Sequence, residues 1–192
     1  MKKIVKKEVR ILGIDDSPHT RKDKEVLCVG VIYRGGNYLD GLLSFKIKKD
    51  GKDATEKIIK SVNKSRHKNQ LQLIMIDGIT LAGFNLVDIK EVNKKTKLPI
   101  IAVMRKRPEM KKFLKALKRI NKKGEKIIRK AGKIFKLKIN RKNLYIQLAG
   151  ISEKKAEKIL KLTSLHSLIP EPLRVAHLIA SGIYFGESKG RA

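Results

Sequence analysis

The sequence predicts an α/β fold in which helices flank a mixed sheet, and three observations lead to this fold class. Residues 9–47 contain three strand-like segments, and a Gly-Gly-Asn turn joins the second to the third. Two short, nearly continuous apolar runs follow at 71–77 and 98–104, which is typical of strands buried on both faces. Helix-like segments precede and separate these two runs. Strands joined through helices are therefore expected beside the antiparallel ones.

The first half of the chain supplies the antiparallel part of this sheet. Alternation over 9–14 predicts the first strand, and the segments 26–33 and 38–47 are the second and third. Asp53 or Thr55 can cap a helix that extends to about residue 66, with apolar side chains on one face. The run 71–77 is then a buried strand.

The second half continues with a helix over about 87–92 and the buried strand 98–104. A helix over about 109–120 opens a lysine-rich stretch, and 133–139 alternates as a strand with Lys136 and Lys138 on its solvent side. A strand at 144–150, a helix over about 152–162 and a last helix after Pro170 complete the chain. We expect one domain over residues 1–192, because no repeat or linker interrupts the pattern.

The charge distribution indicates a polyanionic partner. The formal net charge is +29, and residues 105–142 contribute +16 of it, with 18 Lys and Arg against two Glu. A concentrated basic surface suits nucleic acid, because each neutralised phosphate releases condensed counterions. Part of the lysine excess, 36 Lys against 11 Arg, is typical of hyperthermophile composition and carries no functional information.

Targeting and redox features are few. No run approaches the roughly 18 to 20 apolar residues of a membrane span, and the start of the chain returns to charge before a signal-peptide core could form. We therefore expect a soluble, cytoplasmic protein that does not bind membranes. Cys28 is the single cysteine, so an internal disulfide is impossible and its thiol is expected to pack within a strand.

Two carboxylates stand at the ends of predicted strands. Alternation puts Asp15 on one face of the first strand, and Asp77 ends the run 71–77 in the same way. If these strands are adjacent and parallel, the two carboxylates meet at the sheet edge and repel unless a cation lies between them. Hard oxygen ligands of this kind suit Mg²⁺ or Mn²⁺. Asp16 faces the other way and is a weaker candidate, and strand-end turns are the structural alternative for all three residues.

Further ligands are less clearly marked. Asp50 or Asp53 could supply a third carboxylate, although Asp53 is equally explained as a helix N-cap. His177 lies on an apolar helix face, where a packed, hydrogen-bonded histidine is the ordinary interpretation. Phosphate-binding glycine loops, paired-cysteine zinc spacings and nucleophile elbows are absent from the sequence, so the corresponding function classes have no support.

Four segments nevertheless carry a family resemblance. YLDGLLSF, IMIDGIT, LPIIAVMRK and IPEPLRVAHLIA occur in the order and approximate spacing of endonuclease V, a DNA-repair nuclease. From Val9 to Ile179 the chain resembles more closely a small archaeal family called endonuclease dU. The resemblance implies an RNase H-like mixed five-stranded sheet flanked by helices, with additional C-terminal strands and helices. It also implies a Mg²⁺-dependent endonuclease that cleaves DNA phosphodiesters near deaminated bases such as deoxyuridine or deoxyinosine.

The same resemblance assigns roles to individual positions. Asp15 and Asp77 match metal-binding catalytic aspartates, and His177 falls at a position close to the metal. Arg105 replaces a lysine near the scissile phosphate. Tyr38 matches the aromatic residue that wedges into DNA beside the damaged base.

The chain also departs from the endonuclease V pattern. The glutamate expected after the third strand is absent, so only Asp50 or Asp53 could replace it, and Asp53 is then also a catalytic candidate. Two alternatives stay open, a non-catalytic nucleic-acid-binding protein and an RNA-directed nuclease. Beyond Tyr38, the nucleic-acid contacts are expected from the basic residues Arg105, Lys106, Arg107, Lys136 and Lys138.

Overall fold

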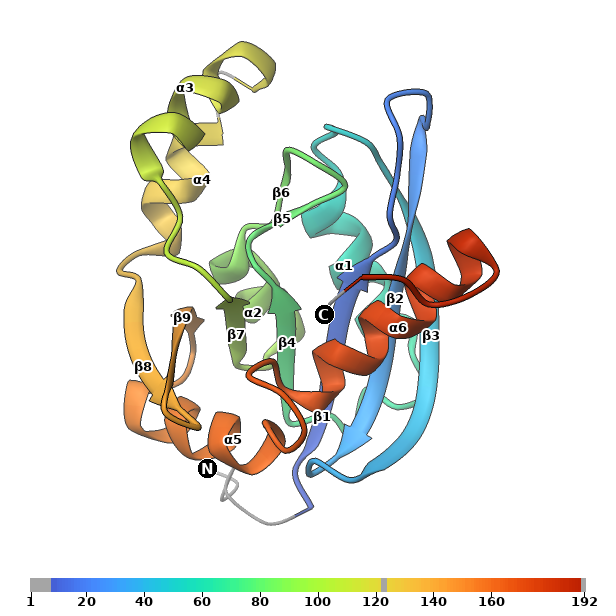
Figure 1. Ribbon diagram of the computed structural model, residues 1–192, viewed down its shortest axis with the longest axis vertical. Coiled ribbons are helices and arrows are strands. Elements are labelled where there is room, and N and C mark those ends of the chain that lie inside the picture. Colours follow the sequence, from blue (N-terminus) through green and yellow to red (C-terminus); the bar gives the residue numbers. More distant parts are fainter. Residues whose placement is uncertain (1–7, 122–123, 191–192) are drawn as a thin grey trace.

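Seven strands form one mixed sheet in the computed structural model, which describes residues 8–121 and 124–190 (Figure 1). Their order across the sheet is β3-β2-β1-β4-β7-β9-β8. The five strands from β3 to β7 form the predicted mixed sheet, and β9 and β8 are the additional C-terminal strands, so the expected architecture is confirmed. The strands are β1 (Arg10–Asp16), β2 (Glu25–Arg34), β3 (Tyr38–Lys48), β4 (Leu73–Asp77), β7 (Ile100–Met104), β8 (Phe135–Ile139) and β9 (Lys142–Ala149).

The pairing directions follow from the connections along the chain. A loop over residues 17–24 joins β1 to β2 and a short turn over 35–37 joins β2 to β3, and both pairs are antiparallel. Helices intervene before β4 and β7, which pair parallel to β1 and β4 respectively. β9 is antiparallel to β7, and β8 is antiparallel to β9. The parallel pair β1 and β4 therefore lies at the centre of the sheet, and the carboxyl ends of both strands point to the same edge.

Helices cover both faces of the sheet, as Figure 1 shows. On one face, α1 (Ala54–Lys64) and α2 (Ile89–Thr96) pack their apolar sides on alternate residues of the central strands. On the other face, α5 (Glu153–Thr163) and α6 (Glu171–Phe185) cover the remaining residues of those strands. Because successive side chains of a strand point to opposite faces, each central strand contributes to two cores. In the described residues, no helix is long and apolar enough to cross a membrane.

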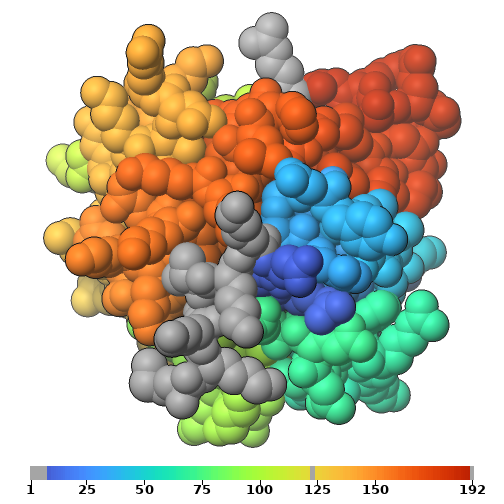
Figure 2. Space-filling view, turned by 90° about the horizontal axis from the view of Figure 1, so that it is seen from below, coloured from blue at the N-terminus to red at the C-terminus, as the bar shows by residue number. Residues whose placement is uncertain are grey.

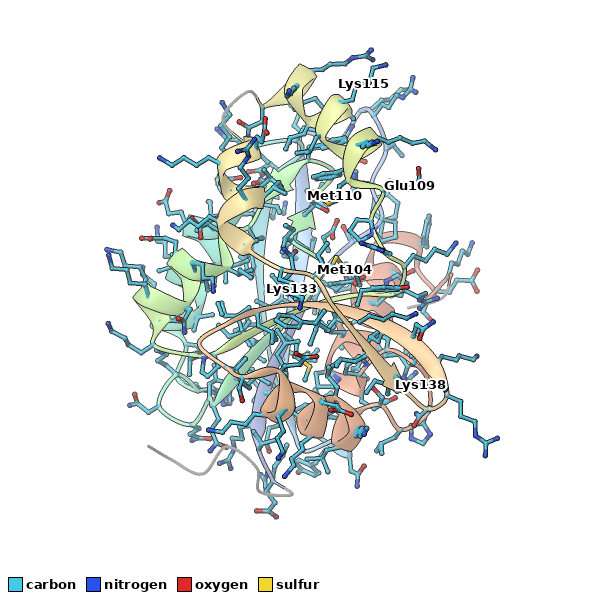
Figure 3. All side chains as sticks on the ribbon, turned by 90° about the vertical axis from the view of Figure 1, so that its left-hand side faces the viewer. Met104, Glu109, Met110, Lys115, Lys133 and Lys138 are labelled. Atoms are coloured by element: carbon cyan, nitrogen blue, oxygen red, sulfur yellow. The ribbon has the colours of Figure 1, made fainter. Side chains whose placement is uncertain are left out.

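A two-helix projection extends beyond the carboxyl edge of the sheet, as Figure 1 shows. It consists of α3 (Met110–Ile120) and α4 (Gly124–Ala131), which rise beside the sheet in Figure 1 and carry many outward-pointing side chains in Figure 3. Lysine and arginine occupy the exposed faces of both helices, while Leu117 and Ile128 are buried against the core. The lysine-rich stretch of the sequence is thus largely a basic helical projection.

Three short elements are absent from the sequence-based expectation. They are the helix α4 and the small two-stranded sheet formed by β5 (Thr80–Leu81) and β6 (Asn85–Leu86). Strands of two residues are too short to show an alternating pattern. Helix α4 has only two adjacent isoleucines and Ala131 among charged residues, and its eight residues extend over about two turns.

Candidate active site

Asp15 and Asp77 stand side by side on the central parallel strands. The register of β1 and β4 pairs Ile14 with Ile76, so the next residue of each strand is the aspartate. The two strands are therefore adjacent and parallel, as the predicted meeting of the two carboxylates requires. Both carboxylates lie at the carboxyl edge of the sheet, where open α/β sheets place their ligand sites.

Helix α6 brings His177 to Asp15. The carboxylate of Asp15 is buried, with 5% of the residue exposed, and its Oδ2 accepts a hydrogen bond of 2.9 Å from His177 Nδ1. This approach requires Gly13, because a Cβ there would lie 2.4 Å from the carbonyl carbon and oxygen of Pro172. A glycine in the strand thus lets the first turn of α6 press directly on the sheet.

The other ring nitrogen of His177 is buried and has no hydrogen-bond partner among the described residues. Nε2 lies close to the backbone of Lys189 and Gly190. The hydrogen bond to Asp15 raises the pKa of His177, the backbone of Lys189 contributes to this rise, and burial opposes it. Histidine at this position is therefore tied to the carboxylates rather than simply packed in the core.

Excess negative charge marks the site. Desolvation, together with the charges of Asp15 and Asp16, raises the pKa of Asp77 to about 7. The side chain of Asp77 is nonetheless accessible to solvent, so protein atoms surround a carboxylate that remains open on one side. Arg105 and His177 act in the opposite direction on this pKa. A carboxyl group with so high a pKa is disfavoured in its ionised form, and a cation bound beside it would stabilise that form.

Asp16 belongs to the same electrostatic cluster but points to the opposite face of β1. Its Oδ2 accepts a 2.9 Å hydrogen bond from the amide of Ala82, beside the β5–β6 hairpin, and lies 3.7 Å from His19 Nδ1. Desolvation and the charge of Asp15 raise the pKa of Asp16 to about 6. Strand alternation correctly predicted that Asp16 faces the other side of the sheet. Asp16 nevertheless raises the pKa of Asp77 through its charge.

Asp50 and Asp53 have other partners. Asp50 Oδ1 accepts from the amide of Phe84 at 2.9 Å, and Asp53 Oδ1 accepts from the side-chain amide of Asn85 at 2.6 Å. Both carboxylates thereby fasten the segment after β3 to the β5–β6 hairpin. Asp53 occupies the N-cap position of α1 without a capping hydrogen bond from its side chain, and Asn85 Oδ1 accepts from the amide of Ala54 instead.

These contacts correct the expectation of a third carboxylate from this segment. Among residues 8–121 and 124–190, no three His, Cys, Asp or Glu side chains form a ready-made metal-binding group. The oxygens of Asp50 and Asp53 hold the backbone of a neighbouring hairpin and its asparagine. Asp15 and Asp77, with His177 beside them, are the groups that could hold a metal at the sheet edge.

Tyr38 lies at the other end of the sheet. β2 runs antiparallel to β1, so Arg34, the strand partner of Tyr38, is level with Arg10 at the start of β1, whereas Asp15 is level with Val29. The Tyr38 ring is 59% exposed, and the guanidinium of Arg34 lies 5.0 Å from its centroid. Figure 2 shows this end of the molecule from below, with the light-blue β2–β3 region against the orange surface of α5 and the segment that follows it. Tyr38 is therefore separated from the candidate metal site along the strands, and its wedge role stays a prediction.

The basic candidates are all exposed but lie in two places. Arg105, Lys106 and Arg107 directly follow β7, next to the carboxyl edge of the sheet. Lys136 and Lys138 lie on the solvent side of β8, the edge strand, as alternation predicted. The first group therefore borders the candidate site, and the second extends the basic surface away from it.

Comparison with known proteins assigns the chain to a family. The family model described as Endonuclease dU matches residues 7–184. The chain belongs to the endonuclease dU family. A UPF0215 protein of Methanosarcina mazei is 53% identical over 192 residues, which cover 98% of this chain and 97% of the relative.

Solved structures agree with the endonuclease dU assignment. The crystal structure of an Archaeoglobus fulgidus protein has a TM-score of 0.84 and 41% identity, covering 92% of this chain and 98% of the other. Endonuclease V of Ciona intestinalis, solved with a 24mer DNA containing an inosine, has a TM-score of 0.58 and 15% identity, covering 88% and 83%. At that identity the likeness shows the fold, which is RNase H-like. Membership of the endonuclease dU family, together with this fold, supports a nuclease that binds nucleic acid.

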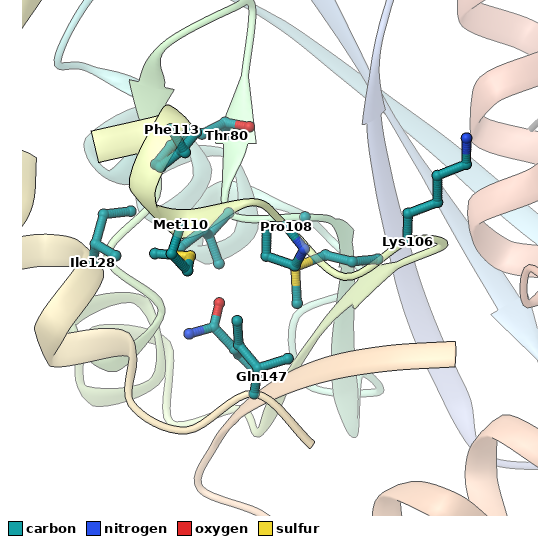
Figure 4. A pocket seen from close by; sticks show the side chains of 11 residues that line it. Thr80, Lys106, Pro108, Met110, Phe113, Ile128 and Gln147 are labelled. Carbon is teal, nitrogen blue, oxygen red and sulfur yellow. The ribbon is translucent and has the colours of Figure 1, made fainter. Parts of the chain in front are cut away.

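The endonuclease dU chain also has an apolar cavity that the sequence analysis missed. It encloses about 180 Å³ between the ends of β4 and β7 and the α3–α4 projection, and Gly78, the neighbour of Asp77, lines it. Figure 4 shows Met110, Phe113 and Ile128 on one side and Gln147 on the other, while the amino group of Lys106 extends away. The apolar residues within the basic stretch are the only sequence feature that could have indicated this cavity. That they line one cavity follows from tertiary packing, which the sequence pattern does not show.

Gln147 is the polar group of this cavity. Residue Gln147 is 3% exposed, and its Nε2 donates a 2.9 Å hydrogen bond to the carbonyl of Gly132. This hydrogen bond fixes the orientation of the amide group, whose Oε1 is a hydrogen-bond acceptor. The cavity of this endonuclease dU member therefore offers an apolar slot with a fixed hydrogen-bond acceptor at the carboxyl edge of the sheet, where Gly78, the residue after Asp77, contributes to its lining.

Proposed function

We propose that this endonuclease dU family member is a metal-dependent endonuclease that hydrolyses DNA phosphodiesters near deaminated bases, in DNA repair. The observation that carries the proposal is the pair Asp15 and Asp77 on adjacent parallel strands, with the pKa of Asp77 raised to about 7. Repelling carboxylates at a ligand-binding edge are suited to a divalent cation, and Mg²⁺ or Mn²⁺ fits their hard oxygen ligands.

The donor set fits Mg²⁺ even though the described residues hold no ready-made three-ligand group. Magnesium sites commonly use one or two protein carboxylates and complete their coordination with water and substrate phosphates. Asp15 and Asp77 would be the carboxylates, and His177 would stand behind them through its hydrogen bond to Asp15. The cation would activate water and stabilise the leaving oxygen.

The chain's own residues would orient the reaction. The hydrogen bond from His177 holds Asp15 in place, and Gly13 allows α6 to maintain that contact. Arg105, exposed next to Asp77, would bind the phosphate by charge-assisted hydrogen bonds. The lysines of the α3–α4 projection would hold the backbone without reading sequence.

The cavity lined by Gly78, the residue after Asp77, supports deaminated bases as the substrate feature. Deamination of cytosine or adenine converts a ring nitrogen that accepts a hydrogen bond into an N–H that donates one. Gln147 Oε1 would accept from that N–H in both uracil and hypoxanthine, and the apolar walls would stack on the base. Damaged pairs are also easier to open, so one slot would serve both lesions.

Cleavage of labelled oligonucleotides tests the proposal. Duplexes with deoxyuridine, deoxyinosine or undamaged bases, and single-stranded DNA and RNA of the same sequences, are incubated with Mg²⁺ or EDTA. Wild type should cut deaminated DNA with Mg²⁺ only, and Asp77→Asn should cut nothing while keeping salt-sensitive binding. Binding of all substrates without cleavage of any would replace the nuclease by a non-catalytic binding protein. Faster cleavage of RNA than of deaminated DNA would make it an RNA-directed nuclease.

A further inference from the structure

A second, cationic cleft opens on the α6 side of Arg105. It has a volume of about 570 Å³ and lies between the end of β7, the start of β9, the segment before α6 and α6 itself. This volume falls within the range of about 300 to 1,000 Å³ typical of ligand sites. Its lining includes Arg105, Lys142, His166, Ser167 and Arg174. The apolar cavity and this cleft share none of their lining residues, so they are separate sites.

The charges of the cleft are poorly compensated. No Asp or Glu side chain lines it. Arg174 is paired with the buried Glu171 through Nε and Nη2, but within the described residues neither Arg105 nor Lys142 forms an ion pair. His166 is exposed and can donate from its ring. Arg105, Lys142 and Arg174 come from three separate segments, and cations gathered around one hollow repel each other unless an anion neutralises them.

Arg105 connects this cleft to the candidate active site. It lines the cleft, and its charge also acts on the pKa of Asp77. A phosphate bound at Asp77 would therefore have the cleft as its neighbour on the α6 side, just as it has the apolar cavity on the α3 side. A nucleic-acid strand that crosses the sheet edge can extend its backbone into the cationic cleft while one base occupies the cavity.

We infer that this cleft binds backbone phosphates of the substrate strand, adjacent to the scissile phosphate. The inference rests on the proposed function for the location of the scissile phosphate, and it adds Lys142, His166 and Ser167 as phosphate-binding residues. Lysine and imidazole N–H groups and the serine hydroxyl are suitable donors to phosphate oxygens. The cleft thereby fixes the position of the strand relative to Asp77 without reading its sequence.

The test compares two charge reversals, Lys142→Glu in the cleft and Lys154→Glu on α5, both at exposed lysines. Each is made in an Asp77→Asn background, so that binding is measured without cleavage. The probes are deoxyuridine duplexes that carry one neutral methylphosphonate, moved one position at a time along the lesion strand. Fluorescence anisotropy across a salt series gives the affinity and its log-log salt slope.

A phosphate held by the cleft has a specific signature in this experiment. In the Lys154→Glu control, neutralising one or two phosphates near the lesion should weaken binding several-fold, and in Lys142→Glu the same positions should have no further effect. The salt slope of Lys142→Glu should be less steep than that of the control by about 0.9 for each phosphate that the cleft no longer neutralises. Equal methylphosphonate profiles in the two variants would overturn the inference. Lys142→Ala provides the same comparison if the glutamate variant does not fold.

The readout is independent of catalysis. A position-specific difference between the variants supports the cleft even if wild type cuts no substrate, in which case only the nuclease proposal fails. Conversely, cleavage of deaminated DNA with identical binding profiles leaves the nuclease intact and removes the cleft from its substrate path.

Discussion

Replacing Asp16 by asparagine should stabilise the metal-free protein at pH 8 and have little effect near pH 4. The pKa of Asp16 is raised from its ordinary value of 3.8 to about 6 in the folded state, first by desolvation and then by Asp15. Between these two values the folded protein binds more protons than the unfolded chain, so the free energy of unfolding falls as the pH rises. Above about pH 6 the ionised carboxylate destabilises the fold fully.

The magnitude follows from the shift. A difference of roughly two pKa units corresponds to about 3 kcal/mol, since each unit is about 1.4 kcal/mol. The Asp16 side chain is 18% exposed, so solvent screens only part of this effect, and about 3 kcal/mol is an upper value. Asparagine has no charge but keeps an oxygen that can accept the hydrogen bond from the amide of Ala82.

Urea unfolding in EDTA at pH 4, 6 and 8 measures the difference. Asp23→Asn is a matched control, because it removes the same charge from an exposed carboxylate whose pKa is lowered by its hydrogen bonds from Thr20. Asp23→Asn should therefore give no stabilisation at pH 8. If Asp16→Asn is no more stable than wild type at pH 8, or if it is stabilised equally at pH 4, the ionised Asp16 carboxylate does not destabilise the fold.

Three further substitutions test other parts of the site. Gln147→Leu removes one hydrogen bond to the base, so it should reduce the preference for uracil- over cytosine-containing duplexes by about 3- to 10-fold. The preference is measured as the ratio of the two cleavage rates, and an unchanged ratio would show that Gln147 does not select the base. Gly13→Ala should lower the free energy of unfolding by about 1 to 3 kcal/mol, because the added Cβ would clash with the Pro172 backbone. Denaturant unfolding measures this, and a variant as stable as wild type would contradict the close packing of α6 on Gly13. Tyr38→Ala should change binding to uracil-containing and undamaged duplexes equally, since the ring lies at the far end of the sheet, and a selective loss on the uracil duplex would restore the wedge role.

The sequence predicted correctly those features that depend on neighbouring residues of one strand or helix. Strand alternation placed Asp15 and Asp77 on their strands and Asp16 on the opposite face, because the period of two is fixed by the backbone. The buried runs 71–77 and 98–104 were recognisable since strands covered on both faces need apolar residues throughout.

Other features depend on contacts between distant segments. Asp53 stands where a helix cap was expected, yet its carboxylate binds Asn85, 32 residues away, and no local pattern reveals that partner. The partnership of His177 with Asp15 relies on the close approach of α6 to Gly13. The distance of Tyr38 from Asp15 along the strands is likewise not visible in its motif, because the antiparallel register of β2 and β3 decides where that motif lies.

The contact between Asp15 and His177 joins residues 162 positions apart, and it has a consequence for the chain during synthesis. β1 and β4 leave the ribosome long before α6, so a nascent chain carries Asp15 and Asp77 and the whole lysine-rich projection without the helix that orients Asp15. The wall of the cationic cleft that α6 provides is missing at that stage as well. On the proposed function, an unfinished or C-terminally clipped polypeptide would carry the basic projection but not the hydrogen bond that holds Asp15, so cleavage would begin only after α6 has docked.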